Sequence, residues 1–167
     1  MASSDAPYPA GSGSLDLPPS LAQRTRRGSV AMTINLIVAA VILGGGSIVE
    51  AVINSNTDRG WLIYFGVIPA ALMVVLGLQL LRIRHVVVGD TLDLDAANQL
   101  RPLLRRAWIA AVVSALAVIV LLLVFDFLAS GGKSGGAIIG ALPPFLCAVV
   151  ANTSYGAAKN WLNPKLD

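Results

Sequence analysis

The sequence has little of the material from which catalytic and metal sites are built. It contains a single histidine, His85, and a single cysteine, Cys147, so neither a His/Cys metal cluster nor an internal disulfide can form. It also lacks the motifs of zinc proteases, serine hydrolases, P-loop proteins and dinucleotide-binding enzymes. We therefore expect no catalytic residue, no metal site and no cofactor, and we expect that the protein is not an enzyme.

Charge is scarce as well. Charged residues make up 13% of the 167-residue chain and hydrophobic residues 56%, with a mean hydropathy of +0.75. These values exclude an ordinary soluble domain, whose usage is far more polar. The composition instead indicates a protein that lies within a membrane.

Long apolar runs are abundant. A hydrocarbon core of about 30 Å needs about 20 helical residues, and only helices or closed barrels satisfy backbone groups in lipid. Four runs meet this requirement, at residues 30–53, 61–81, 108–129 and 135–158. The sequence predicts an all-α integral membrane protein with four transmembrane helices in residues 29–162, a loop at 82–107 and a short C-terminus at 163–167.

The basic residues predict the orientation. Ten of the twelve Lys and Arg residues precede the first run, separate the second from the third, or follow the fourth. Because short basic loops resist translocation, we expect both termini and the central loop to be cytoplasmic. The sequence has few lysines and many arginines, a bias typical of GC-rich bacterial genomes. We therefore expect a bacterial protein that lies in the plasma membrane. Six arginines are expected to anchor lipid headgroups, including anionic ones: Arg26, Arg27, Arg82, Arg84, Arg105 and Arg106.

The basic residues do not predict a nucleic-acid partner, because no basic surface is interleaved with aromatic residues. Trp108 follows Arg105 and Arg106 at the start of the third run and is expected to mark the membrane interface.

Residues 1–28 are rich in Pro, Gly and Ser and offer almost no large apolar side chain. Such a segment does not offset its ordering entropy, so we expect a disordered cytoplasmic tail.

An internal similarity relates the second run to the fourth. Gly66-Val-Ile-Pro69 resembles Gly140-Ala-Leu-Pro143, and an arginine pair precedes each odd-numbered run. Two interpretations stay open: a duplicated helical hairpin in parallel repeat, or a chance match between sequences of few residue types. In either case, Pro69 and Pro143 are expected to kink their helices.

Small residues indicate where helices pack in lipid, since close approach of backbones replaces the hydrophobic effect there. The residues expected at such contacts are Gly66, Ala70, Gly136, Gly140 and Ala148. On the first run, a narrow sector is also expected to face protein, and it contains Asn35, Ala39, Gly46 and Glu50.

The acidic residues allow two functional hypotheses. Glu50 and Asp126 lie near the outer ends of the first and third runs, where they serve either as headgroup anchors or as part of an ion pathway. In the central loop, Asp90, Asp93 and Asp95 form either a solvated turn, with Asp95 capping a helix, or a weak cation site. Pro102 is expected in the first turn of the third helix.

Two functions of different class follow. The first is a non-catalytic accessory or scaffold subunit of a larger membrane complex, whose small-residue faces bind the helices of partner membrane proteins. A homo-oligomer is the other expected assembly, and it would favour the alternative. The alternative is an oligomeric transporter or channel for a small solute or ion that uses Glu50 and Asp126. The lack of a polar cluster at the middle of the apolar runs favours the first.

Overall fold

The structure is a computed structural model, and it describes residues 13–53, 66–130 and 136–163. It is mostly helical. The helices are α1 (Pro19–Ile53), α3 (Val67–Leu81), α4 (Ile83–Val86), α5 (Leu94–Ser130) and α6 (Gly136–Leu162). Three short strands, β1 (Ser14–Asp16), β2 (Val87–Val88) and β3 (Thr91–Asp93), form a small sheet that the sequence did not reveal.

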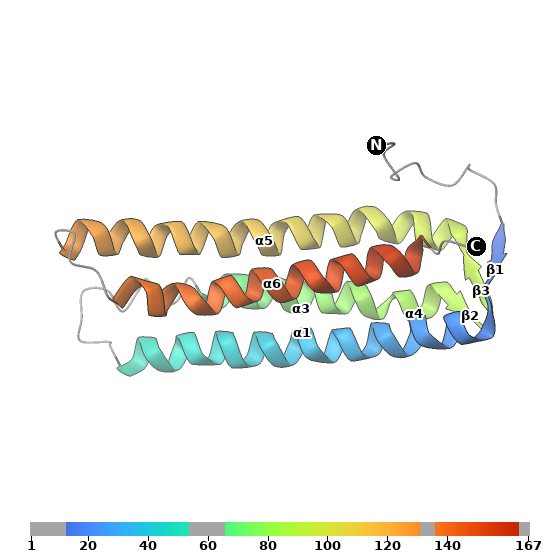
Figure 1. The fold of residues 1–167 in the computed structure, drawn as a ribbon, viewed down its shortest axis with the longest axis horizontal. Coiled ribbons are helices and arrows are strands. Elements are labelled where there is room, and N and C mark those ends of the chain that lie inside the picture. Colours follow the sequence, from blue (N-terminus) through green and yellow to red (C-terminus); the bar gives the residue numbers. More distant parts are fainter. Residues whose placement is uncertain (1–12, 54–65, 131–135, 164–167) are drawn as a thin grey trace.

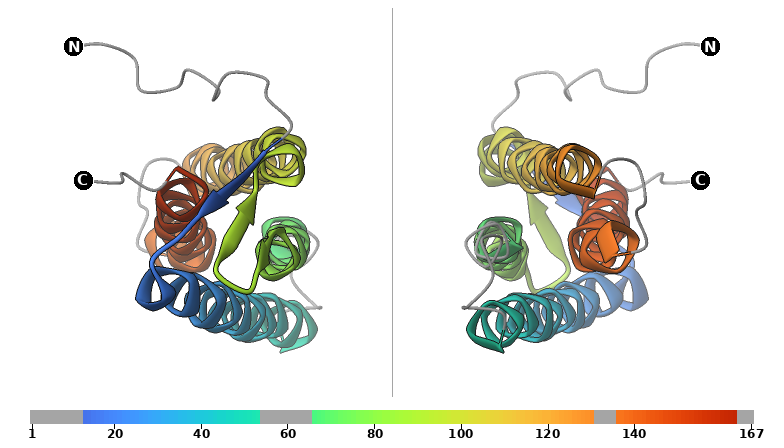
Figure 2. Two further views of the ribbon diagram at one scale, coloured as in Figure 1. Left: turned by 90° about the vertical axis from the view of Figure 1, so that its right-hand side faces the viewer. Right: turned by 90° about the vertical axis from the view of Figure 1, so that its left-hand side faces the viewer.

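The four long helices form an antiparallel bundle (Figure 1). Seen end-on, they follow one another around the bundle in the order α1, α3, α5, α6 (Figure 2). The most extensive packing is within the pairs α1/α3 and α5/α6. This pairing is that of two consecutive hairpins, and whether the hairpins arose by duplication stays a prediction.

Three of the helical segments are long and apolar enough to cross a membrane: Pro19–Val49, Val67–Val86 and Leu94–Val124. The prediction of a helical protein with membrane-crossing segments is therefore confirmed for three of the four expected spans. α6 is not among the three, and the side chains of its first five residues lie outside the described part.

Exposed apolar side chains encircle the bundle at one level, which we call the apolar band. It includes exposed residues from Ile34 to Val52 on α1, Ile68 to Leu81 on α3, Ile109 to Leu128 on α5 and Leu142 to Val149 on α6. At the rise of an α-helix, the band is about 27 Å tall on α1 and about 28 Å on α5, close to the thickness of a hydrocarbon core.

The small sheet lies across one end of the bundle, which we call the sheet end (Figure 2). Strand β3 pairs antiparallel with both β1 and β2, with Leu15 opposite Leu92 and Val87 also opposite Leu92. Leu92 is completely buried, so the sheet covers the core at this end with an apolar side chain. The β2–β3 turn has Gly89 at a φ of 60°, as the first central residue of a type II′ turn requires.

The sheet corrects the expectation for the N-terminal tail. From residue 13 onward, the segment predicted to be disordered is ordered: it forms β1 and the first turns of α1. The backbone of Leu17 donates to the carbonyl of Asp90, and Arg26 Nη2 donates to the carbonyl of Gly89 at 2.8 Å. Pro19 is the first residue of α1. The N–H of a first helical residue has no acceptor within the helix, so proline, which lacks that N–H, begins a helix without losing a hydrogen bond.

The central loop also differs from its expectation. Most of residues 82–107 is regular structure, because α5 begins at Leu94, two turns before Pro102, near which the third helix was expected to begin. Pro102 therefore lies inside α5 and not in its first turn. The helix is capped by Asp93, whose Oδ1 accepts from the backbone of Asp95 and Ala96, and not by Asp95.

Candidate functional site

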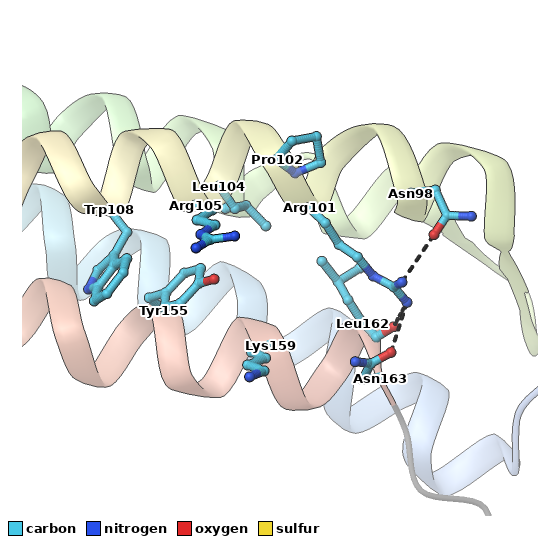
Figure 3. A pocket seen from close by; sticks show the side chains of 10 residues that line it. All are labelled: Asn98, Arg101, Pro102, Leu104, Arg105, Trp108, Tyr155, Lys159, Leu162 and Asn163. Atoms are coloured by element: carbon cyan, nitrogen blue, oxygen red, sulfur yellow. Dashed lines mark hydrogen bonds between the residues drawn. The ribbon is translucent and has the colours of Figure 1, made fainter. Parts of the chain in front are cut away.

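Two polar helix faces meet between α5 and α6, next to the sheet end. On α5, Arg101, Arg105 and Trp108 follow at intervals of four and three residues and so share one side of the helix. On α6, Tyr155 and Lys159 do the same. Figure 3 shows these side chains directed into the space between the two helices.

They line a cavity of about 650 Å³, which we call the α5–α6 groove. The volume falls within the range that small-molecule sites occupy. The lining residues are Asn98, Arg101, Pro102, Leu104, Arg105, Trp108, Tyr155, Lys159, Leu162 and Asn163.

Arg101 fixes the polar end of the groove. Its Nη1 donates to Asn98 Oδ1 at 3.0 Å, and its Nη2 donates to the carbonyl of Leu162 at 2.6 Å and to Asn163 Oδ1 at 2.9 Å (Figure 3). The cation thus binds a carbonyl at the C-terminus of α6, where the helix dipole is negative. This clamp holds α5 and α6 together at the sheet end.

A stacked aromatic pair forms the other end of the groove. The rings of Trp108 and Tyr155 are stacked, with centroids 4.5 Å apart and planes inclined by 10°. Stacked aromatic rings contribute about 0.5–1.5 kcal/mol beyond their buried area. Trp108 directly precedes Ile109, the first exposed residue of the apolar band on α5. The aromatic pair therefore marks the boundary between the polar and apolar parts of the surface.

The groove is lined by cations. Arg101, Arg105 and Lys159 line it, and among the described residues of its lining there is no aspartate or glutamate. Guanidinium and ammonium groups converging on one cavity attract an anion and recognise carboxylate or phosphate oxygens. The groove is therefore chemically suited to an anionic ligand.

The predicted headgroup anchors occupy different environments. Arg27, Arg82, Arg84, Arg105 and Arg106 are exposed around the sheet end, as anchors would be. Arg105 also lines the groove. Arg26 is half-buried and donates to Gly89, so it secures the β2–β3 turn.

The residues predicted to pack helices are partly within the described side chains. A Cβ placed on Gly66 would lie 2.5 Å from Ser47 Oγ, and one on Gly44 would lie 3.0 Å from the Cβ of Ala70. α1 and α3 therefore approach closely at these positions. Ala148 is half-buried in α6, whereas the surroundings of Gly136 and Gly140 lie outside the described part.

Pro69 and one predicted sector differ from expectation, whereas the kink expected at Pro143 stays a prediction. Pro69 lies in the first turn of α3, where it interrupts no hydrogen bond of that helix, so it does not kink α3. Pro143 lies inside α6 and is followed by Pro144. On α1, Asn35 and Gly46 are exposed, and the buried polar face instead includes Ser29, Thr33 and Ser47.

The acidic candidates are not brought into a site by the described residues. Glu50 and Asp126 lie in α1 and α5, but their side chains are outside the described part of the chain. In the residues that are described, no three His, Cys, Asp or Glu side chains are grouped as metal ligands would be. Asp93 caps α5 instead, while Asp90 and Asp95 are exposed.

Sequence reasoning identified Arg105 and Trp108 only as interface anchors and did not pair them with α6. The signal that was available is the matched spacing of Arg101, Arg105 and Trp108 with Tyr155 and Lys159. Spacing alone does not show that these two faces lie opposite each other, which follows only from the packing of α5 against α6.

Comparison with protein families, curated proteins and solved structures finds no match to this chain.

Proposed function

We propose that the protein is a four-helix integral membrane protein with its sheet end on the cytoplasmic side of a bacterial plasma membrane. The apolar band supports this assignment, because α6 contributes exposed Leu142, Phe145, Leu146 and Val149 alongside the other three helices. Arginines surround the sheet end and set the orientation through the retention of basic segments in the cytoplasm.

Within this membrane domain, we propose a non-catalytic accessory or scaffold role. The observation that carries it is the content of the described interior, which is filled by small and aliphatic residues such as Ala40, Ala70, Ala111, Ala115 and Ala151. Such an interior suits a rigid support better than a path for ions or solutes.

The polar groups of this interior are neutral. Among the described residues, the polar residues that are buried as a whole carry hydroxyls, and those of Ser29, Thr33 and Ser47 donate to backbone carbonyls. The half-buried Gln79 adds a neutral amide, whose Oε1 is also buried. Hydroxyls bonded in this way stabilise helices without offering charge to a passing ion.

Membrane insertion and orientation are tested on the full chain in cells. Alkaline carbonate should leave the protein in the membrane pellet, and reporters inserted at Thr57 and Lys133 should behave as external. Release into the supernatant would contradict the membrane assignment, and a cytoplasmic signal at either reporter would contradict the orientation.

The accessory role is tested by photo-crosslinking in cells. A photoreactive phenylalanine analogue replaces one exposed residue of the apolar band on each helix: Val41, Leu78, Val120 or Leu146. The four positions control for one another, because all are exposed to the same surroundings unless a partner covers them. We expect an adduct of one defined mass from one or two adjacent helices, containing a second membrane protein.

Two outcomes contradict this role. Lipid adducts from all four positions would leave no partner, and adducts of twice the chain's own mass would indicate a homo-oligomer. A homo-oligomer that conducts ions in liposomes would favour the transporter instead.

A further inference from the structure

We infer that the α5–α6 groove binds a phosphate group, carried by the headgroup of an anionic phospholipid. The inference goes beyond the accessory role but rests on the proposed membrane embedding of the apolar band. Three cations, Arg101, Arg105 and Lys159, line one cavity of about 650 Å³.

The chemistry of the groove matches a phosphate. Arg105 and Lys159 come from facing helices, and Arg101 lies one turn before Arg105 on α5 (Figure 3). Guanidinium groups pair with phosphate oxygens through two parallel hydrogen bonds, and an ammonium adds a compact charge.

The level of the groove favours a lipid as the carrier of the phosphate. Trp108 directly precedes Ile109, where the apolar band begins on α5, so the basic residues lie one to two turns outside the predicted hydrocarbon. That is the level of lipid phosphates, and basic pockets between transmembrane helices on the cytoplasmic side bind anionic headgroups.

The surface beyond the aromatic pair suits an acyl chain. Ile109 and Leu116, four and eleven residues after Arg105, lie on the same side of α5 and are exposed. On α6, the exposed Phe145 lies fourteen residues before Lys159 and only about 40° from it around the helix. A headgroup in the groove therefore has apolar surface next to it, on the side of the apolar band, where the acyl chains of a lipid can pack. A soluble phosphate has no acyl chain to place there.

The two basic residues to be tested have a matched control pair. Arg105 and Lys159 are both exposed and line the groove from facing helices. Arg84 and Arg106 are exposed at the same end but lie outside the groove lining. The double variants R105Q/K159Q and R84Q/R106Q change the net charge equally.

The experiment measures lipid binding to the full chain in detergent by native mass spectrometry. The probes are phosphatidylglycerol and, as the lipid without net charge, phosphatidylcholine, at one fixed salt concentration for all variants. We expect R105Q/K159Q to weaken phosphatidylglycerol binding by at least about tenfold and R84Q/R106Q by less than about twofold, since only the first pair contacts the phosphate. Phosphatidylcholine should bind weakly to all variants.

A charge-preserving variant separates binding from folding. R105K/K159R retains both cations, so we expect it to bind phosphatidylglycerol within about threefold of the parent, and thermal denaturation should show all three variants folded. Parent-like binding by R105Q/K159Q, or an equal loss in R84Q/R106Q, would overturn the groove as the site.

The source of the phosphate is tested by competition. We expect millimolar inorganic phosphate to leave phosphatidylglycerol binding unchanged. If inorganic phosphate displaces the lipid with the same dependence on Arg105 and Lys159, the lipid source is overturned. Failure of lipid binding would leave carbonate extraction and reporter topology unaffected, so it is distinguishable from failure of the proposed function.

Discussion

The two halves of the bundle are held together by different interactions. At the sheet end, strand pairing and long side chains bridge the elements: Arg26 binds the β2–β3 turn, and Arg101 binds the end of α6. In the half surrounded by the apolar band, close packing of small residues dominates, as where Gly66 meets Ser47.

The difference reflects the two solvents proposed for the halves. In water, burial of apolar side chains drives association, and a cap such as Leu92 over the core is effective. In lipid, apolar burial no longer distinguishes packed from separated helices, so stability comes from van der Waals contact and interhelical hydrogen bonds. Four predictions test this contrast, from the largest expected effect to the smallest.

The largest effect is expected from Leu92→Asp. Leu92 is completely buried beneath the sheet, and an unpaired carboxylate there should lower the free energy of unfolding by about 4 kcal/mol. Hydrogen exchange should show lost protection at β1, β3 and the start of α1, with the helices of the apolar band still protected. Val88→Asp is the control, because Val88 is 66% exposed. Uniform loss of protection along the bundle would contradict separate halves.

Arg101→Gln should remove the clamp between α5 and α6. Hydrogen bonds to a charged donor contribute about 1.5–3 kcal/mol, so we expect a loss of about 2 kcal/mol in detergent denaturation. The exposed Arg106→Gln should change stability by less than about 0.5 kcal/mol. Equal effects of the two variants would show that net charge matters and the clamp does not.

Gly66→Ala tests packing in the apolar half. Its Cβ would meet Ser47 Oγ at 2.5 Å, so α1 and α3 must separate or Ser47 must move, at a cost of about 1–2 kcal/mol. Gly45→Ala meets no atom within 4 Å and should stabilise α1 by about 0.8 kcal/mol through helix propensity. The same denaturation titration measures both, and stabilisation by Gly66→Ala would contradict the close contact.

Thr33→Val should have the smallest effect. The Thr33 hydroxyl shares its one proton between two backbone carbonyls, that of Gly77 on α3 at 3.0 Å and that of Ser29 on its own helix at 2.8 Å. Hydrogen bonds between membrane helices average about 0.6 kcal/mol, and we expect a loss of that size. Thr153→Val, whose hydroxyl bonds only within α6, should be neutral. A loss as large as that of Arg101→Gln would erase the contrast between the halves.

Much of the architecture follows from local properties of the sequence. Hydropathy and length predicted the three helices that are long and apolar enough to cross a membrane, because a spanning helix must be apolar over the thickness of the bilayer whatever its neighbours are. The small residues near Gly66 and Ala70 likewise indicated a close contact, since the absence of a large side chain is itself the requirement. These inferences needed no knowledge of which helix is adjacent to which.

The tertiary structure decided what depends on distant partners. Residues 14–16 have little apolar content and read as disordered, yet they gain a backbone partner in β3 and become a strand. Arg101 and Lys159 are far apart in the sequence and line one groove only because α5 packs on α6. Hydropathy describes how each residue interacts with solvent, whereas strand pairing and convergent charge depend on which residues the fold brings together.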